Sequence, residues 1–176
     1  MRPTLAISLF VAGERALLIG SGPSAAERAA RLTEAGASVT PVAETAFSEG
    51  ALSGHRLVLL CDDAQDPALA ERVHAAARAQ GVLCYAQDRP EHSDFALPAL
   101  VRRGPVRVAV STEGGAPALA RRLREELERV LDPRLAEFAE SLARERESLP
   151  SGERREAMAS KVAGLRIDGA LVLPDA

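Results

Sequence analysis

A small-residue motif, Gly20-Ser21-Gly22 followed by Ala25, comes after an apolar run at 16–19 and before a stretch rich in helix-forming residues. This spacing is that of the dinucleotide-binding fingerprint, with alanine at the third small position. Gly20 permits a sharp turn out of a strand, Gly22 lets the backbone approach a pyrophosphate, and Ala25 keeps the helix close to the sheet. The motif predicts dinucleotide binding at the positive end of a helix, although Gly-x-Gly also occurs in ordinary tight turns.

Acidic residues follow three of the predicted strands, at the edge where open α/β sheets bind ligands. Glu44 stands 22 residues after Gly22. A carboxylate there either hydrogen-bonds a ribose diol, which favours NAD over its 2′-phosphorylated form, or is a surface glutamate. Asp62 follows the third strand and either contacts the cofactor or starts a loop. Asp88 follows the fourth strand, where it could act as a general base near a nicotinamide or simply cap a loop.

A second polar loop, STEGGAP at 111–117, leads into a predicted helix. It could bind an anion at the helix N-terminus, or it could merely cap the helix. The histidines and cysteines have no spacing typical of a zinc or iron site. Cys61 and Cys84 each fall at or near the end of an apolar run, which predicts buried thiols in adjacent strands rather than a disulfide or metal pair.

Strand and helix signals alternate over roughly the first 86 residues, as expected of right-handed βαβ units. Asp66 is the expected N-cap of the second helix. Pro41 indicates either that the second strand lies near an edge of the sheet or that Pro41 itself stands near the end of the strand. The apolar segment 5–11 is expected beside the sheet as an accessory or edge element. The predicted strands are 16–19, 38–43, 56–61 and 82–86, and the predicted helices are 25–35 and 66–80.

Beyond Asp88 the alternation stops. Residues 97–101 and 106–111 are two extended segments that either form a hairpin or pair with a second subunit. From Pro117 onward leucines recur at spacings of three and four, which predicts amphipathic helices interrupted at Asp132-Pro133. Their interleaved charges are typical of a solvated helical surface that packs on itself or on a partner.

Composition narrows the classes of function. The chain has 176 residues, 47% hydrophobic and 27% charged, which is typical of a globular domain. Its net charge of -3 argues against sequence-independent binding of nucleic acid. No stretch approaches the ~20 apolar residues of a membrane span, and no signal peptide is visible. We therefore expect a cytoplasmic protein with neither nucleic-acid nor membrane partners.

Taken in order, these residues resemble the precorrin-2 dehydrogenase / sirohydrochlorin ferrochelatase family, the dehydrogenase module of sirohaem synthases. The similarity is carried by LAISLFVAGERALLIGSG at 5–22, the first helix at 25–37, Asp88, FALPALVRRGPVRVAVST at 95–112 and GGAPALARRLREELE at 114–128. The resemblance implies α/β class: a Rossmann-like, mostly parallel sheet, then a dimerisation segment and a C-terminal helical module. The expected domains are 1–96, 97–131 and 132–176.

The resemblance also implies an activity and its residues. Family members oxidise precorrin-2 to sirohydrochlorin with NAD, and some then insert ferrous iron without a dedicated set of protein metal ligands. They form homodimers. Asp88 is the implied catalytic residue. The candidate NAD contacts are Gly20, Ser21, Gly22, Pro23, Ser24, Ala25, Glu44 and Thr45, to which the sheet edge adds Asp62. The candidate contacts to the polycarboxylate substrate are Arg89, Arg102, Arg103, Ser111 and Thr112.

The sequence departs from the family pattern in several places. Ser21 replaces a glycine, Arg28 a common lysine and Tyr85 a frequent asparagine, while Glu113 and Ala116 alter the polar loop. The two loop changes bear on chelation more than on dehydrogenation. The chain ends without a methyltransferase domain, so a separate protein would supply precorrin-2. Two other functions stay open, a non-catalytic nucleotide-sensing domain and an NAD-dependent enzyme for another anionic substrate.

Overall fold

The computed structural model describes residues 3–61 and 66–169. They divide into two compact units, Thr4–Leu97 and a second made mainly of the chain from Pro98 onward. The domain boundary expected between residues 131 and 132 stays a prediction. Within the described residues, no helix is both long enough and apolar enough to cross a membrane.

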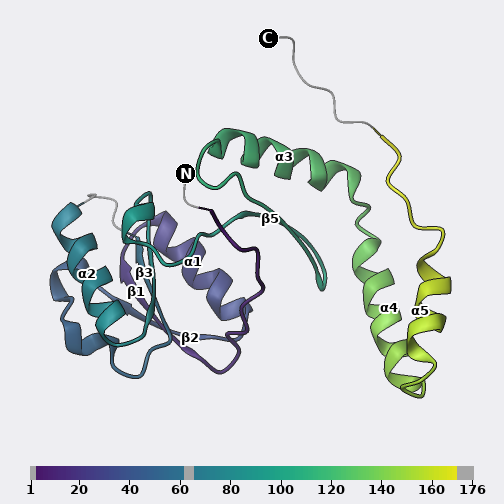
Figure 1. The fold of residues 1–176 in the computed structure, drawn as a ribbon, viewed down its shortest axis with the longest axis horizontal. Coiled ribbons are helices and arrows are strands. Elements are labelled where there is room, and N and C mark those ends of the chain that lie inside the picture. The colour runs from purple at the N-terminus through teal and green to yellow at the C-terminus, as the bar shows by residue number, and fades with distance from the viewer. Residues whose placement is uncertain (1–2, 62–65, 170–176) are drawn as a thin grey trace, which may run out of the picture. The chain divides into compact units, whose positions relative to one another are not determined.

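The first unit is a four-stranded parallel sheet with the strand order β2-β1-β3-β4 and helices on both faces (Figure 1). The order in which strands are added reverses at β1, because β2 lies on one side of β1 while β3 and β4 lie on the other. The predicted Rossmann-like α/β fold is confirmed. The elements are β1 Arg15–Gly20, α1 Pro23–Glu34, β2 Ser38–Val42, β3 Leu57–Cys61, α2 Pro67–Ala79 and β4 Leu83–Ala86, with short 3-10 helices η1 Glu44–Ala46, η2 Glu49–Leu52 and η3 Pro90–His92.

Alternating side chains of the strands enter two hydrophobic clusters, one on each face of the sheet. Leu17 of β1 packs into the cluster that contains α2, and its neighbour Leu18 into the cluster that contains Ala25 of α1. All five residues of β3 are buried, as a parallel strand covered on both faces requires. As predicted, Asp66 caps α2 by accepting a hydrogen bond of 2.9 Å from the amide of Ala68.

Two further sequence predictions have clear outcomes. Cys61 and Cys84 are not joined in a disulfide, and both are buried on the neighbouring strands β3 and β4, which confirms the buried-thiol interpretation. For segment 5–11 the edge-strand alternative was wrong, although Val11 at its end is buried in the cluster that contains Ala25. That segment joins neither sheet, and Phe10 is 91% exposed. Apolarity alone does not create a pairing partner, and the open edge of β4 is already paired by loop residues.

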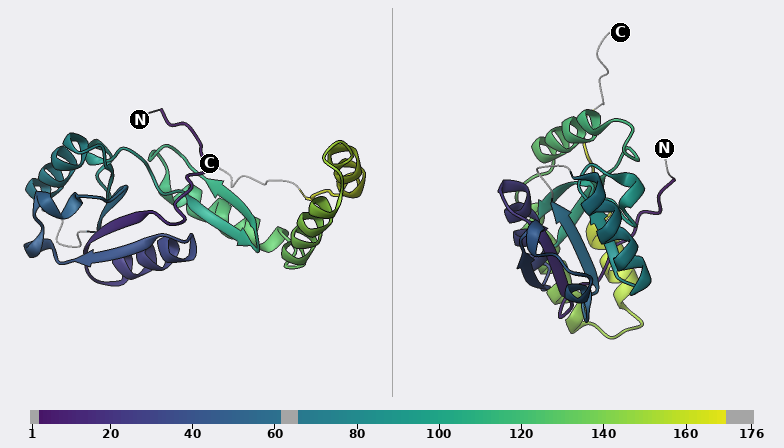
Figure 2. Two further views of the ribbon diagram at one scale, coloured as in Figure 1. Left: turned by 90° about the horizontal axis from the view of Figure 1, so that it is seen from below. Right: turned by 90° about the vertical axis from the view of Figure 1, so that its left-hand side faces the viewer.

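The second unit begins with an antiparallel hairpin, so the hairpin alternative for the two extended segments is correct. Strands β5 Ala99–Arg103 and β6 Val106–Val110 are joined through Gly104, and α3 Pro117–Val130 packs against them (Figure 2). Gly104 has φ +55°, and a Cβ there would lie 2.8 Å from the Cβ of Ala136. Helices α4 Leu135–Ser148 and α5 Arg154–Val162 follow as a helical pair.

Candidate functional site

The glycine turn lies at the carboxyl end of β1, beside the end of β3. Gly20 has φ +114°, and a Cβ on it would lie only 2.2 Å from the carbonyl oxygen of Cys61. The same Cβ would lie 3.3 Å from Oε1 of Glu44. Only glycine therefore fits this turn, and the Glu44 carboxylate lies over it. The turn stands at the reversal point of the sheet, where open α/β folds bind ligands.

The start of α1 suits a phosphate group. Gly22, with φ +89°, is the N-cap, and Pro23 occupies the first turn. Among the described residues, no side chain caps this end and no acidic residue stands in the first turn. The first-turn amides, which have no partner within a helix, can therefore bind an anion. Glu44 and Thr45 open η1 next to this turn, so the arrangement fits a dinucleotide with pyrophosphate at the helix and ribose near Glu44.

Asp88 is exposed and follows β4 on the same carboxyl edge of the sheet, two strands from Gly20. Its φ is +56°, and among the described residues only Glu113 shares this left-handed conformation without being glycine. The amide of Arg89 donates to the carbonyl of Ala86 (3.2 Å) and closes the turn around Asp88. Aspartate tolerates this conformation better than most residues, yet strained backbone of this kind concentrates at functional sites.

One contact near the site was not predicted from the sequence. The Arg28 guanidinium on α1 donates to Tyr85 Oη on β4 (3.1 Å) and lies over the tyrosine ring, 5.4 Å from its centroid. The guanidinium also donates to the carbonyl of Ser24 (3.1 Å), inside the predicted cofactor turn. The ring of Phe95 packs against the ring of Tyr85, with the two centroids 5.9 Å apart. The Arg28–Tyr85 contact joins the glycine turn to the strand that precedes Asp88. Because 57 residues separate Arg28 and Tyr85, no local pattern indicates the pair.

The remaining predicted residues lie elsewhere. Asp62 is outside the described residues. Arg89 is half-buried in the Asp88 turn, while Arg102 and Arg103 belong to β5 of the second unit. The Arg103 guanidinium donates to the carbonyls of Leu131 (3.1 Å) and Glu128 (2.5 Å). These are carbonyls at the end of α3, so the contacts of Arg103 favour a structural role over substrate binding.

The loop before α3 also has internal contacts. The Thr112 hydroxyl accepts a hydrogen bond of 3.2 Å from the amide of Ala116, the N-cap of α3. The Ser111 hydroxyl accepts a longer one, 3.3 Å, from the amide of Glu113. Both contacts lie within the loop, and among the described residues no side chain caps the first turn of α3, so the structure does not decide between the two alternatives for this loop. Anion binding by Ser111 and Thr112 stays a prediction.

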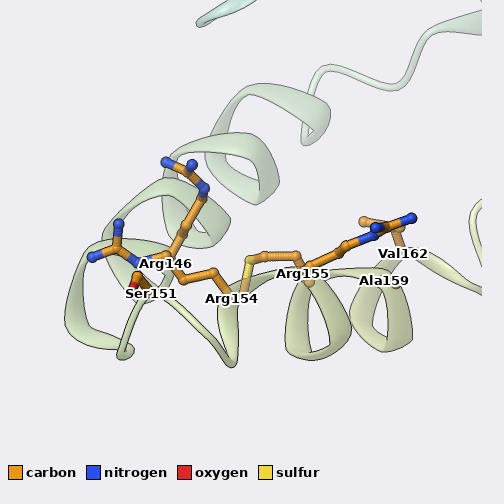
Figure 3. A pocket seen from close by; sticks show the side chains of 7 residues that line it. Arg146, Ser151, Arg154, Arg155, Ala159 and Val162 are labelled. Carbon is orange, nitrogen blue, oxygen red and sulfur yellow. The ribbon is translucent and has the colours of Figure 1, made fainter.

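An open cavity of about 610 Å³ lies in the second unit, at the α4–α5 pair (Figure 3). Arg146 and Arg154 stand at one end of it and Arg155 extends toward the other. Arg154 also donates to the carbonyl of Leu149 at 2.9 Å. The other lining residues are Ser151, Met158, Ala159 and Val162. None of the predicted site residues lines this cavity, so the candidate site is the carboxyl edge of the parallel sheet.

Two family models match the chain. Residues 7–99 match the family described as "Putative NAD(P)-binding", and residues 103–129 match the one described as "Sirohaem biosynthesis protein central". The first covers more than half of the chain and includes both the glycine turn and Asp88.

Curated relatives agree with these matches. "Siroheme synthase" of Nitrosococcus oceani is 37% identical over 157 residues, covering 77% of this chain and 33% of the relative. "Siroheme synthase" of Gluconacetobacter diazotrophicus is 47% identical over 95 residues, covering 54% of this chain and 20% of the relative. The chain thus spans no more than about a third of these relatives. Among solved structures, "SirC, precorrin-2 dehydrogenase" matches with a TM-score of 0.73 at 19% identity, covering 90% of this chain and 89% of that one, which shows a shared fold.

Proposed function

We propose that this chain oxidises precorrin-2 to sirohydrochlorin with NAD. It belongs to the NAD(P)-binding family whose model matches residues 7–99, and it is similar to part of the sirohaem synthases. The observation that carries the proposal is the shared carboxyl edge of one parallel sheet. It holds a glycine turn suited to a dinucleotide and, two strands away, Asp88 in a left-handed turn. A cofactor and a proton acceptor can therefore approach one substrate from the same side.

Each residue of the proposed site has a distinct role. When bound, NAD accepts the hydride that leaves a carbon of the macrocycle. Asp88 receives the proton that leaves in the same oxidation, which is general-base chemistry by a carboxylate. The turn 20–25 holds the pyrophosphate, and Glu44 and Thr45 hold the ribose. The exposure of Asp88 leaves its carboxylate accessible to a large macrocycle.

Arginines near the two predicted loops would bind the carboxylates of the substrate. Arg89, within the Asp88 turn, is the strongest candidate in the first unit, and Arg102 is the candidate on β5. We further propose that the protein acts as a homodimer in the cytoplasm. Both statements are carried over from the family resemblance.

Insertion of ferrous iron at the same edge is the second part of the proposal. The macrocycle nitrogens would bind the iron, and Asp88 would accept their protons. Adding ferrous iron to sirohydrochlorin in the presence of the protein tests this step separately. Spectral conversion to sirohaem above the rate without protein supports it, and no acceleration excludes it.

The decisive assay supplies precorrin-2 and NAD without oxygen and follows NADH together with the sirohydrochlorin spectrum. Asp88→Asn should lower kcat by about 10²–10⁴, the usual contribution of a general base, while the Kd for NAD stays unchanged. Glu91→Gln, an exposed residue of the same loop, is the matched control and should keep full activity.

The same assay separates the alternatives. Binding of NAD by the unmodified protein without turnover would favour a nucleotide-sensing domain. A fully active Asp88→Asn variant would remove Asp88 from the reaction. Gly22→Asp should abolish NAD binding, because a carboxylate at the N-cap would occupy the phosphate position. Retained helicity in the far ultraviolet would show that this loss is not unfolding.

A further inference from the structure

Strand β4 is an edge strand that pairs only with β3. The opposite side of an edge strand ordinarily presents unpaired amides and carbonyls. Here the chain returns and pairs with them. The amide of Asp94 donates to the carbonyl of Cys84 (2.7 Å), and the amide of Cys84 donates to Oδ2 of Asp94 (3.0 Å). Asp94 therefore acts as a one-residue extension of the sheet.

Ser93 completes this pairing two residues further along β4. Its side chain is buried, and its hydroxyl accepts a hydrogen bond of 3.0 Å from the amide of Ala86. The hydroxyl also lies within donating distance of two carbonyls, those of Ala86 (3.2 Å) and Arg89 (2.9 Å). One serine thus contacts both the residue before the Asp88 turn and the residue after it.

The carboxylate of Asp94 also reaches α2. Its Oδ1 lies 3.4 Å from Nε2 of His74, while its Oδ2 holds the amide of Cys84. Both side chains of this pair are largely shielded from solvent, with exposed fractions of 15% and 25%. The loop that carries Asp88 is therefore fastened to a strand and to a helix, not only to its own backbone.

Between these anchors the backbone of Asp88 adopts φ +56°. A left-handed residue other than glycine persists only where its surroundings hold it. We propose that Ser93 and Asp94 are positioning residues that hold the Asp88 turn in this conformation and so present the carboxylate at the carboxyl edge of the sheet. The inference rests on the proposed function, because the presented carboxylate is the one assigned the proton.

The test compares Ser93→Ala and Asp94→Ala with the unmodified protein, measuring kcat, the Kd for NAD and amide hydrogen exchange. We expect kcat to fall about 10- to 100-fold, since small misplacements of a reacting group have effects of this size. The Kd for NAD should stay within about twofold, because the glycine turn lies two strands away. Exchange should accelerate at the amides of Cys84, Ala86 and Arg89.

Two further variants distinguish positioning from general destabilisation. Asp94→Asn keeps an oxygen that can accept from the Cys84 amide and should restore most of kcat and most of the protection. Glu91→Ala, exposed in the same loop, should change neither. Unchanged kcat in a variant whose loop exchanges faster would overturn the inference, as would a parallel loss of NAD affinity. Absence of turnover in the unmodified protein would instead overturn the proposed function, a separate result of the same assay.

Discussion

The two units of the molecule bury their side chains to very different extents. Among the described residues, the buried hydrophobic side chains lie in Thr4–Leu97 except for Val101 and Ala120. Helices α4 and α5 have no buried residue, and Leu119 of α3 is 50% exposed. Burial of apolar surface is the dominant stabilising contribution in folding. The parallel sheet unit is therefore equipped to fold on its own, and the second unit is not.

Charge does not compensate for the missing core. The helices of the second unit carry ion pairs such as Arg124–Glu128 (2.7 Å) and Lys161–Glu145 (2.7 Å), and in each pair both side chains keep solvent contact. Exposed pairs of this kind contribute about 0–1 kcal/mol each. Most of the stability of the chain therefore resides in the unit that carries the candidate site.

Separating the units gives the largest expected effect. A fragment of residues 1–97 should fold cooperatively and bind NAD, because it retains both hydrophobic clusters and the glycine turn. A fragment of residues 98–176 should lose most of its helicity at micromolar concentration. Thermal unfolding followed by circular dichroism checks both. A cooperative transition in the second fragment would show that the second unit folds on its own, contrary to this expectation.

A matched pair of core and surface truncations comes next. Leu60→Ala should destabilise the first unit by about 2–5 kcal/mol, since Leu60 is 1% exposed and its removal leaves a cavity. Phe138→Ala in α4, where the ring is 37% exposed, should cost less than about 1 kcal/mol. Urea unfolding followed by circular dichroism measures both. Fluorescence of Tyr85 reports the first unit alone, because the chain has one tyrosine and no tryptophan.

Two glycine substitutions, one in each unit, test local packing at a smaller energetic scale. Gly20→Ala should cost at least about 1–3 kcal/mol and abolish NAD binding, because its Cβ would overlap the backbone of Cys61. Gly114→Ala meets no atom within 4 Å, so only its φ of +78° opposes the side chain. We expect about 1 kcal/mol there. Equal costs at the two positions would contradict the close packing at the end of β1.

The smallest predicted effect depends on pH and is confined to the first unit. Burial raises the pKa of the Cys84 thiol to about 12, and the Asp94 carboxylate adds to the rise. The folded state thus holds a neutral thiol where the unfolded chain would ionise. This contribution to stability is complete below about pH 9, the usual thiol range, and is lost as pH rises toward 12. Unfolding by urea between pH 8 and 11 should show a decline that Cys84→Ala reduces.

The sequence alone determined the four strands and the helices α1 and α2 of the first unit to within a residue or two, but it did not indicate the short 3-10 helices. The signals of the four strands and two helices are local: a glycine turn after an apolar run, the cap Asp66, and the uninterrupted apolar strand 57–61. Short-range sterics and hydrogen bonding produce such elements wherever these residues occur. The same reasoning wrongly allowed segment 5–11 as an edge strand. The apolar character of a segment shows its preference for burial but not which element is available to cover it.

Only the tertiary structure decided how the site is held. The Arg28–Tyr85 contact spans 57 residues, Asp94 pairs with Cys84 ten residues earlier, and Arg103 contacts the end of α3 28 residues later. The left-handed backbone of Asp88 likewise appears only in the folded turn. These features depend on which strand forms the edge of the sheet and on what returns to cover it. Such pairings have no periodicity in the chain, so local patterns predict the acidic residue at the edge and not the contacts that orient it.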